Sequence, residues 1–470
     1  MILTVDIGTS AFKSAVWDLD GTRLSFASVP LKSEIAEGGK HEAAPSQWLE
    51  AFDTCCANLG NIASVQAIVI SGNGPSLVPV LGELADDNSL NVPAEKARLW
   101  LDRRGVKYSE EVSALMNDYV DSSFFLPKIL HIKREENNLY QITKKFLGCP
   151  EFLAYTLTGQ ARTVFPCEGF DRWFWNDAIL EKLNLDAHKF PPFIRPGDSF
   201  GSISQKAAER FGFKKDIQII SGGPDFFTAI LGSGVMEPGQ ACNRTGSSDG
   251  INLCTVKRIN HKSLMSYAFP IEPYWNLSGM INTTGRAIEW GKELLGLESI
   301  GDFMALAEKS GYGSGGLVFL PYLSGERSPI WNPNVRALWN GINIDTGRSE
   351  FANSILEGIG FAINDVISVM EQTGEKVEQI YVTGGLAGFE RLNQIKADIT
   401  GKEIITCACK EAELLGLAVI GSCFLGKYSS FTQAVNALRC IKNKYKPNSI
   451  NKDLYNHLFY EYKKLRDNML

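Results

Sequence analysis

The chain has 470 residues, of which 44% are hydrophobic and 21% charged, and its net charge is −6. This composition excludes a disordered or fibrous protein, and the acidic balance argues against nucleic acid or an anionic membrane as a partner. At roughly 100–200 residues per domain, the length predicts two domains, each with its own core.

The start of the chain and its cysteines indicate a cytoplasmic protein. Residues 1–6 lead directly into a strand and have no basic segment, so we expect no signal peptide. No apolar run reaches the roughly 18–20 residues that cross a bilayer. The ten cysteines are scattered without metal-binding spacing, which favours free thiols in a reducing compartment.

Strand-like and helical patterns alternate along the chain, which predicts an α/β protein. The elements expected in chain order are strands at 2–7, 12–18, 66–70 and 217–220, strands at 241–244 and 250–256, a helix at 351–373, a strand at 379–383 and a helix at 389–400. The polar, lysine-rich stretch from Lys442 is expected to close the chain as a surface helix.

The pattern restarts after Glu237-Pro238-Gly239, where a second pair of strands flanks a turn like the first. We therefore predict one domain over 1–237 and another over 238–470. Two similar halves suggest a duplicated fold with a ligand cleft between them.

A glycine turn after the first strand is a candidate phosphate site. Gly8 lets the backbone approach an anion, and the hydroxyl and N–H groups of Thr9 and Ser10 form a concave set of donors. Asp6 could hold Mg²⁺ through water, and Lys13 could neutralise a transferred phosphoryl group. An ordinary hairpin turn explains the same residues equally well.

A second candidate is Gly222-Gly223-Pro224-Asp225, between an apolar strand and a helix. The glycines and the start of the helix together favour a bound phosphate. Asp225 could accept the proton of a hydroxyl group whose oxygen attacks a phosphoryl group. Taken alone, the motif is explained more simply by helix capping.

Two turns in the second half have the composition of nucleotide-binding loops. Thr245-Gly246-Ser247-Ser248 repeats the turn of the first half, and the glycine cluster 384–388 could lie against adenine or ribose. A tight strand–helix turn explains the cluster equally well. The chain has neither a P-loop pattern nor the spaced glycines of a dinucleotide fold.

The segment Trp100-Leu101-Asp102-Arg103-Arg104 is a candidate for sugar binding. Aromatic faces pack on the C–H surfaces of sugars, and Asp/Arg pairs bind neighbouring hydroxyl groups. A surface turn with an ion pair would contain the same residues.

In this order, the motifs resemble the FGGY family of carbohydrate kinases, within the actin/hexokinase/Hsp70 ATPase superfamily, and its xylulose-kinase-like branch in particular. The segments 337–342 and 350–357 are together similar to the family's C-terminal signature. Segments that also match are 320–329, 384–385, 394–401 and 411–418. The resemblance implies two ribonuclease-H-like, actin-like α/β domains with a catalytic cleft between them.

The resemblance also implies a role for each matching residue. Asp225 corresponds to the catalytic base, and Asp6, with Asp225 as a second candidate, to the metal site. The residues it assigns to the nucleotide are Gly8, Thr9, Ser10, Lys13, Gly222, Gly223, Thr245, Gly246, Ser247, Gly285, Glu289, Gly384 and Gly385. Those near the acceptor are Asn73, Gly74, Trp100, Asp102 and Arg103. The implied cofactors are ATP and Mg²⁺, and members of the family are often homodimers.

Three segments depart from the family's best-known members. The loop 71–76 reads Ser-Gly-Asn-Gly-Pro-Ser, without the Met-His of xylulose kinases or the Arg-Glu pair of glycerol kinases, which argues against both acceptors. The N-terminal signature keeps Lys128, but His131 stands where Trp is typical. In 165–173, which replaces a usually small, polar stretch, Glu168, Asp171 and Trp173 could reshape the sugar pocket or could simply pack locally.

We therefore predict ATP-dependent phosphorylation of a hydroxyl group on a small sugar or polyol, such as a ketose. One alternative is a sensor that binds sugar and nucleotide with little catalysis, against which the retained Asp6, Lys13 and Asp225 argue. Another is a chaperone-like or filament-forming ATPase, against which the sugar-kinase motifs argue.

Overall fold

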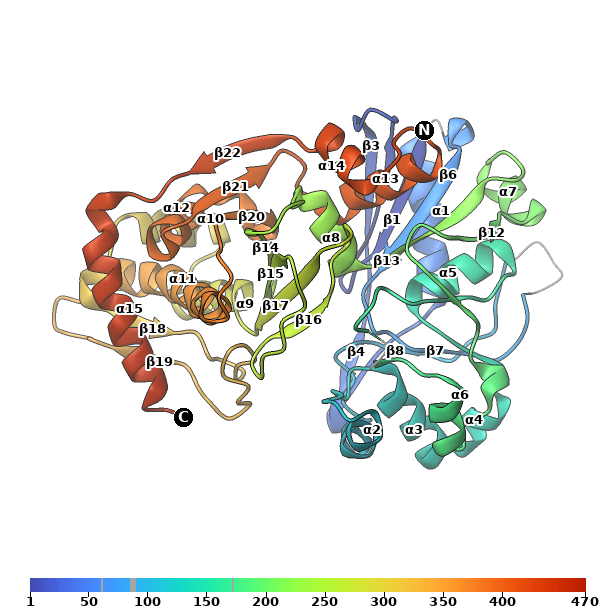
Figure 1. The fold of residues 1–470 in the computed structure, drawn as a ribbon, viewed down its shortest axis with the longest axis horizontal. Helices are drawn as coiled ribbons and strands as arrows, with labels where there is room; N and C mark the ends of the chain where they lie inside the picture. Colours follow the sequence, from blue (N-terminus) through green and yellow to red (C-terminus); the bar gives the residue numbers. More distant parts are fainter. Residues whose placement is uncertain (61, 85–89, 171–172) are drawn as a thin grey trace. The chain divides into compact units, whose positions relative to one another are not determined.

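The computed structural model describes residues 1–60, 62–84, 90–170 and 173–470, and its contacts divide the chain into two compact units (Figure 1). The first unit comprises Met1–Gly232 and Glu413–Leu438, and the second comprises Ser233–Ala412 and Arg439–Leu470. The first change of unit thus falls between residues 232 and 233. A segment from the far end of the chain completes the first unit, and the sequence pattern shows no sign of this return.

The first unit is built on a six-stranded sheet with the order β12-β13-β6-β1-β2-β3. Strands β1, β2 and β3 form an antiparallel meander, β6 and β13 run parallel to β1, and β12 is antiparallel to β13. Their bounds are β1 (Ile2–Ile7), β2 (Ala11–Trp17), β3 (Arg23–Pro30), β6 (Ala67–Gly72), β12 (Ser199–Ser202) and β13 (Gln218–Pro224). The turn expected after the first strand joins β1 to β2.

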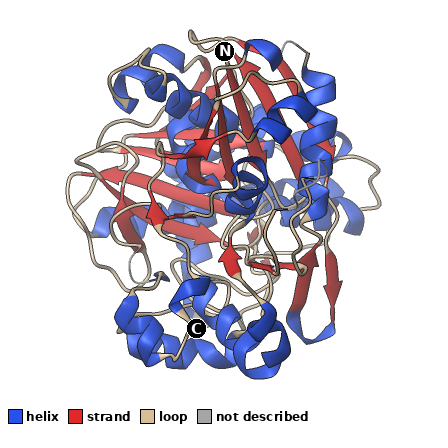
Figure 2. Ribbon diagram, turned by 90° about the vertical axis from the view of Figure 1, so that its right-hand side faces the viewer, coloured by secondary structure: helices blue, strands red, loops and turns tan. Residues whose placement is uncertain are grey.

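Helices cover both faces of this sheet, and Figure 2 shows strands flanked by helices. On one face lie α1 (Ser46–Leu59), α5 (Cys149–Thr158) and α7 (Gln205–Phe211), which share an apolar cluster with Leu3 and Val5. Because successive strand residues point to opposite faces, Ile2 faces the other way. There Gly421 of α13 (Ala412–Phe424) lies against Ile2, and Figure 1 shows this helix beside β1.

Smaller elements complete the first unit. Strands β4, β5 and β8 form one small sheet, β7 pairs with β9, and β10 pairs with β11. The strands are β4 (Glu34–Ala36), β5 (Lys40–Ala43), β7 (Val78–Val80), β8 (Ala97–Arg98), β9 (Lys145–Leu147), β10 (Thr163–Val164) and β11 (Phe193–Ile194). The helices are α2 (Ser109–Met116), α3 (Phe125–Glu135), α4 (Asn137–Ile142), α6 (Asp177–Lys182), α8 (Asp225–Ser233) and α14 (Phe431–Leu438).

The second unit repeats the strand plan of the first. Its sheet has the order β16-β17-β15-β14-β20-β21-β22, with an antiparallel run from β14 to β16, parallel β20 and β21, and antiparallel β22 at the edge. The bounds are β14 (Gln240–Thr245), β15 (Asp249–Thr255), β16 (Met265–Ala268), β17 (Trp275–Ile281), β20 (Gln379–Gly384), β21 (Glu403–Cys407) and β22 (Ile441–Tyr445). This confirms the prediction of two similar α/β halves.

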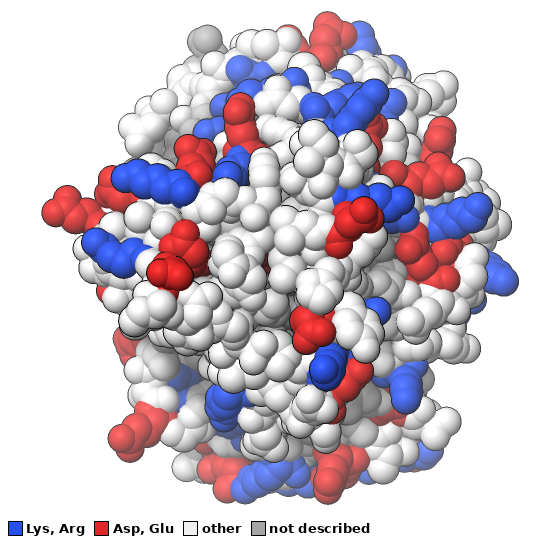
Figure 3. Space-filling view, turned by 90° about the vertical axis from the view of Figure 1, so that its left-hand side faces the viewer, with Lys and Arg blue, Asp and Glu red and all other residues white. Residues whose placement is uncertain are grey.

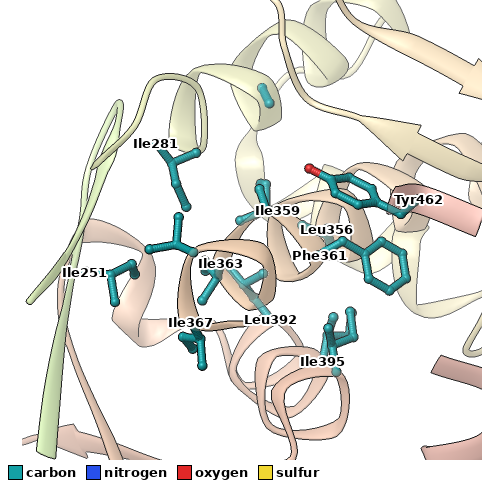
Figure 4. Packing of buried hydrophobic residues seen from close by; sticks show 14 of the residues in the cluster. Ile251, Ile281, Leu356, Ile359, Phe361, Ile363, Ile367, Leu392, Ile395 and Tyr462 are labelled. Carbon is teal, nitrogen blue, oxygen red and sulfur yellow. The ribbon is translucent and has the colours of Figure 1, made fainter. Parts of the chain in front are cut away.

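The core of the second unit surrounds α11 (Arg348–Gln372), as Figure 4 shows. Ile359 and Ile363 of this helix lie between strand residues such as Ile251 on one side and helix residues such as Leu392 on the other. The remaining elements of the unit are α9 (Gly285–Leu294), α10 (Ile300–Glu308), α12 (Glu390–Thr400), α15 (Lys452–Asp467) and the pair β18 (Val318–Leu320) and β19 (Leu338–Asn340).

The end of the chain differs from the expected surface helix. Residues 441–445 form β22, which pairs with β21, and the last helix begins only at Lys452. The strand forms because backbone groups at the edge of β21 need hydrogen-bond partners. In α15, Tyr455, Leu458 and Tyr462 are buried at helical spacing, so one face of this helix belongs to the core.

On the face drawn in Figure 3, acidic and basic side chains are interspersed. No helix within the described residues is long and apolar enough to cross a membrane.

Candidate functional site

Three predicted site segments lie at the carboxyl ends of adjacent parallel strands in the first unit. The register pairs Ile7 of β1 with Gly72 of β6, and Gly72 with Pro224 of β13. Asp6, the loop after Gly72, and Asp225 therefore lie at one edge of the sheet. Open α/β sheets bind their ligands at this edge.

The turn after β1 needs glycine and adjoins a predicted sugar-binding residue. The Gly8 N–H donates to the carbonyl of Ala11 at 3.0 Å, and a Cβ on Gly8 would lie 2.8 Å from that oxygen. The indole Nε1 of Trp100 donates to Thr9 Oγ1 at 3.1 Å. The tertiary structure thus brings Trp100 to the candidate phosphate turn, 91 residues earlier in the chain.

Electrostatic interactions place Asp6 and Asp225 near one buried thiol. Burial raises the pKa of Cys149, and the carboxylates of Glu151, Asp6 and Asp225 raise it further. Lys13 on β2 is the cross-strand partner of Asp6. This edge of the sheet therefore carries two carboxylates and a cation, which are the charges that phosphoryl transfer requires.

Asp225 is the first residue of α8 and is half-buried. The two glycines before it have packing roles: a Cβ on Gly222 would lie 2.1 Å from Leu417 Cδ2, and one on Gly223, whose φ is +79°, would lie 2.9 Å from Pro196 Cγ. Packing at Gly222, and packing together with backbone conformation at Gly223, therefore account for glycine at these positions.

The predicted sugar loop is held from within the first unit. Asn73 Nδ2 donates to the carbonyl at the end of β1 at 2.9 Å, and Ser76 Oγ donates to Asn73 Oδ1 at 2.6 Å. Lys128 Nζ donates to the carbonyl of Pro75 at 2.7 Å, and burial lowers the pKa of Lys128 to about 7. Gly74 is exposed, with open space where a Cβ would stand.

Asp102 is fully buried, and the protein itself supplies the donors to its carboxylate. Arg104 Nη2 donates to Oδ2 at 2.7 Å, and the N–H of His41 donates to the same oxygen at 3.1 Å. Burial opposes the ionisation of Asp102, but these hydrogen bonds outweigh it, and the pKa is lowered. Arg104 also binds Glu42 at 2.6 Å, so Asp102 belongs to a buried ionic network.

The remaining acceptor candidates are not gathered at one point. Arg103 is exposed and pairs with Asp121 at 2.6 Å. Glu168 is exposed in the segment after β10. Asp171 lies outside the described residues.

In the second unit, the turn that begins at Thr245 meets the glycine cluster that begins at Gly384; both are predicted to bind the nucleotide. Thr245 ends β14 and lies in register with Gly384, which ends β20. Thr245 Oγ1 donates to the carbonyl of Thr383 at 2.6 Å and accepts the N–H of Leu386 at 3.1 Å. A Cβ on Gly384 would lie 2.0 Å from the Thr245 carbonyl oxygen, so only glycine permits this approach.

The third nucleotide segment, at the start of α9, joins the same assembly. The Gly285 N–H donates to the Gly246 carbonyl at 3.0 Å, and a Cβ on Gly285 would lie 2.3 Å from that oxygen. Thr284 Oγ1 donates to Asp249 Oδ1 at 2.5 Å. The turn 245–248, the start of α9 and the loop 385–388 therefore form one connected surface.

This surface has the open backbone that a nucleotide needs. Gly246 and Ser247 are exposed, and Gly385 is exposed with open space where a Cβ would stand. A phosphate or a planar base can approach such backbone closely. Glu289 is also exposed, and it binds Lys292 at 2.8 Å on the same helix. The residues present fit a nucleotide.

The described residues contain no group of three or more His, Cys, Asp or Glu side chains that would form a metal cluster. Mg²⁺ in phosphoryl-transfer sites is held by one or two carboxylates together with water and substrate phosphates. Asp6, at the end of β1, and Asp225, which follows β13, come from strands on either side of β6. They are a donor set of this kind, and they fit Mg²⁺.

Several buried residues behind these surfaces were not predicted from the sequence; they are Asp249, Thr284 and Lys396 in the second unit and Cys149 in the first. One signal was available: Asp249 begins an otherwise largely apolar strand, and Lys396 interrupts the apolar face of α12. A charged residue at a core position usually has a partner.

Two family models match the chain. The N-terminal domain of the FGGY family of carbohydrate kinases matches residues 1–232, and its C-terminal domain matches residues 243–424. The chain therefore belongs to the FGGY family of carbohydrate kinases, which are phosphotransferases that phosphorylate sugars with ATP.

The following individual relatives are distant but match over nearly their whole length. A xylulose kinase of Staphylococcus epidermidis is 26% identical over 483 residues, which cover 98% of this chain and 95% of the relative. The structure of a xylulose kinase from Lactobacillus acidophilus has a TM-score of 0.87 at 22% identity and covers 100% of this chain and 98% of its own. A gluconate kinase from the same organism also has a TM-score of 0.87 at 22% identity and covers 99% and 97%. The fold is thus common to kinases named for different acceptors.

Proposed function

We propose that this protein transfers the γ-phosphoryl group of ATP to a hydroxyl group of a small ketose or related polyol, with Asp225 as the general base. The observation that carries the proposal is the placement of Asp6, the loop 73–76 and Asp225 at the carboxyl ends of three adjacent strands. The nucleotide side is supported by the connected glycine surface of the second unit.

In this mechanism, Asp225 accepts the proton of the acceptor hydroxyl as its oxygen attacks phosphorus. Lys13 and the backbone N–H groups of Thr9 and Ser10 stabilise the charge on the transferred group, and Trp100 packs on the acceptor. Asp6 would hold Mg²⁺ through water, with Asp225 as a second candidate ligand, and the ion would neutralise part of the phosphate charge. Positioning of the two reactants supplies most of the acceleration.

The acceptor class rests on the relatives and on the loop 71–76. Relatives named xylulose kinase support a ketose, and the loop's Asn-Gly-Pro supports one other than xylulose. A homodimer and a cytoplasmic location stay predictions, which light scattering and cell fractionation would test.

Replacing Asp225 with Asn tests the base. We expect kcat to fall by about 10²–10⁴-fold, the usual contribution of general-base catalysis, because the amide cannot accept the proton. Affinity for ADP, measured by calorimetry, should change less than about twofold, since the nucleotide surface does not include this carboxylate.

A matched control is Asp177→Asn, since Asp177 is also the first residue of a helix but is exposed. This variant should keep the wild-type kcat. An Asp225→Asn enzyme with the wild-type kcat would show that Asp225 only begins its helix.

Release of ADP, measured with a coupled assay against ketopentoses, deoxyketohexoses, tetruloses, alditols and aldonates, tests the reaction itself. We expect release that depends on one of the ketoses or alditols. Release without any sugar would instead indicate an ATPase. Sugar and nucleotide binding without release would indicate a sensor.

A further inference from the structure

A buried ion pair lies behind the candidate nucleotide turn of the second unit. Asp249 and Lys396 are 1% and 0% exposed, and Lys396 Nζ lies 3.9 Å from Asp249 Oδ2. Asn243 bridges them: its Nδ2 donates to Asp249 Oδ2 at 2.9 Å, and its Oδ1 accepts Lys396 Nζ at 2.7 Å. The three residues come from β14, β15 and α12, so the pair exists only in the folded unit.

The other oxygen of Asp249 faces the nucleotide surface. Oδ1 accepts the hydroxyl of Thr284 at 2.5 Å and the N–H of Gly246 at 3.4 Å. The N–H of Thr284 in turn donates to the carbonyl of Ser247 at 3.2 Å. One carboxylate therefore connects the turn 245–248 to the residue before α9, the two segments expected to contact phosphate.

A buried carboxylate in this place has an electrostatic disadvantage. A negative charge behind a phosphate site repels the nucleotide, and in the low-dielectric interior the repulsion is weakly screened. A positive charge on the far side of the carboxylate cancels most of this field. Lys396 lies there, and it enters from α12, the helix that follows the loop 385–388.

We propose that Asp249 is a positioning residue for the nucleotide phosphates and that Lys396 is the counter-charge that keeps Asp249 from repelling them. Asp249 shapes the site by holding the turn 245–248 and Thr284 together. Lys396 makes this carboxylate compatible with a bound triphosphate. The proposal rests on the proposed function of the turn as the nucleotide site.

The proposal predicts how the KM for ATP differs among three variants, which are Lys396→Met, Asp249→Asn and the double variant. A purely structural ion pair would not give this pattern. Lys396→Met leaves the Asp249 charge uncompensated, so the KM for ATP should rise about tenfold, as expected when a buried charge loses its partner. In Asp249→Asn with Lys396→Met, neither charge remains, and the KM should return to within about threefold of Asp249→Asn alone. The KM for the acceptor should change less than about twofold in all three.

The readouts are the two KM values, ADP affinity by calorimetry, and the melting temperature without ligand. If the ion pair only stabilises the fold, its removal will change the melting temperature but not the affinity for ADP. The proposal is overturned if the double variant binds ATP as weakly as Lys396→Met, or if the KM for the acceptor rises as much as that for ATP.

A further variant, Thr284→Val, keeps the test decisive if Lys396→Met does not fold. Thr284→Val removes the hydroxyl bound to Asp249 without changing charge, and it should raise the KM for ATP about fivefold. An unchanged KM would contradict the positioning role. Lys402→Met is the matched control, because Lys402 pairs with Glu371 at 2.6 Å in a partly exposed site and should leave both KM values unchanged.

Hydrogen exchange of the wild-type protein separates this proposal from the proposed function. If ADP does not protect the turn 245–248, the assignment of the nucleotide site is wrong. If ADP protects the turn but the variants bind ADP normally, only the role of Asp249 and Lys396 is wrong.

Discussion

Glu326 is a buried carboxylate in the second unit with only one of its oxygens bonded. The N–H groups of Asn282 and Arg327 donate to Oε1, each at 2.7 Å, whereas Oε2 has no hydrogen-bond partner among the described residues. Burial raises the pKa of Glu326 to about 7, with the two N–H groups opposing it and Asp365 adding to it. Asn282 lies at the end of β17, just before the nucleotide segment at α9, so this carboxylate helps to hold that end in place.

Stability should therefore depend on the titration of Glu326. Between the ordinary pKa of 4.5 and the raised pKa of about 7, the folded protein holds a proton that the unfolded chain has lost, so stability falls as pH rises through this window. Glu326→Gln removes this titration. The free energy of unfolding of the variant minus that of wild type should increase by about 2–4 kcal/mol as the pH is raised from 4.5 to 8.

Urea unfolding of both proteins across this pH range measures the difference. Glu308→Gln, at an exposed position, serves as the control and should follow the wild-type curve. Parallel curves for wild type and Glu326→Gln would contradict the raised pKa.

At the scale of elements, α13 packs closely against α8, the helix that begins with Asp225. A Cβ on Gly416 of α13 would lie 1.9 Å from the carbonyl oxygen of Thr228 in α8. Thr228 Oγ1 donates to the carbonyl of Asp225 at 3.0 Å, so the contact lies one turn from the proposed base. The backbone of α8 can occupy this position only because residue 416 has no side chain.

Gly416→Ala should therefore destabilise the first unit. Alanine in place of glycine within a helix ordinarily stabilises by about 0.5–1 kcal/mol. Here overpacking should reverse the sign and lower the free energy of unfolding by about 1–3 kcal/mol, with a fall in kcat as α8 shifts. Thermal unfolding and steady-state kinetics measure the two effects.

Gly301→Ala in α10 is the matched control, because its Cβ would meet nothing closer than 3.4 Å at an exposed position. That variant should be neutral or slightly more stable. A stabilised Gly416→Ala protein would mean that α13 and α8 do not approach as the structure has them.

At the scale of the whole molecule, each unit carries the groups proposed for one side of the reaction. The first unit carries the acceptor loop, the first phosphate turn and Asp225, and the second carries the glycine surface for the nucleotide. Phosphoryl transfer requires both sets of groups. Ligands that bind one set should therefore protect one unit first.

Hydrogen exchange with single ligands tests this division. ADP alone should slow exchange at 245–248 and 384–388, and the acceptor sugar alone should slow it at 73–76, because a ligand stabilises the segment that it contacts. Salt at the same ionic strength is the control for non-specific effects. Protection by ADP confined to the first unit would contradict the assignment.

Much of the fold could be predicted locally. The strands expected at 2–7 and 379–383 appear as β1 and β20, because short runs rich in apolar residues, followed by turn residues, are visible within a few positions. The helix expected at 351–373 is α11, which begins three residues earlier, where Glu350 accepts the N–H of Gly347 at 3.0 Å. In contrast, 441–445 could not be recognised as a strand, because its partner β21 is more than thirty residues earlier.

The candidate site was predictable in part. The turns at Gly8 and Gly246 and the carboxylate at Asp225 were visible as motifs, because they combine turn chemistry with a strand end. The need for glycine at position 222 could not be predicted, because it arises from contact with Leu417, almost two hundred residues later. Asp102 is similar: its carboxylate meets His41 and Arg104 only after folding.

The sequence by itself determined the family, the α/β class, the duplicated strand plan and the order of the motifs, because these depend on local periodicity and on residue types at short spacing. Only the tertiary structure decided that 413–438 complete the first unit, that Trp100 lies at Thr9, and that Lys396 lies behind Asp249. These features depend on which distant segments share a core, and burial and charge compensation are properties of that three-dimensional neighbourhood.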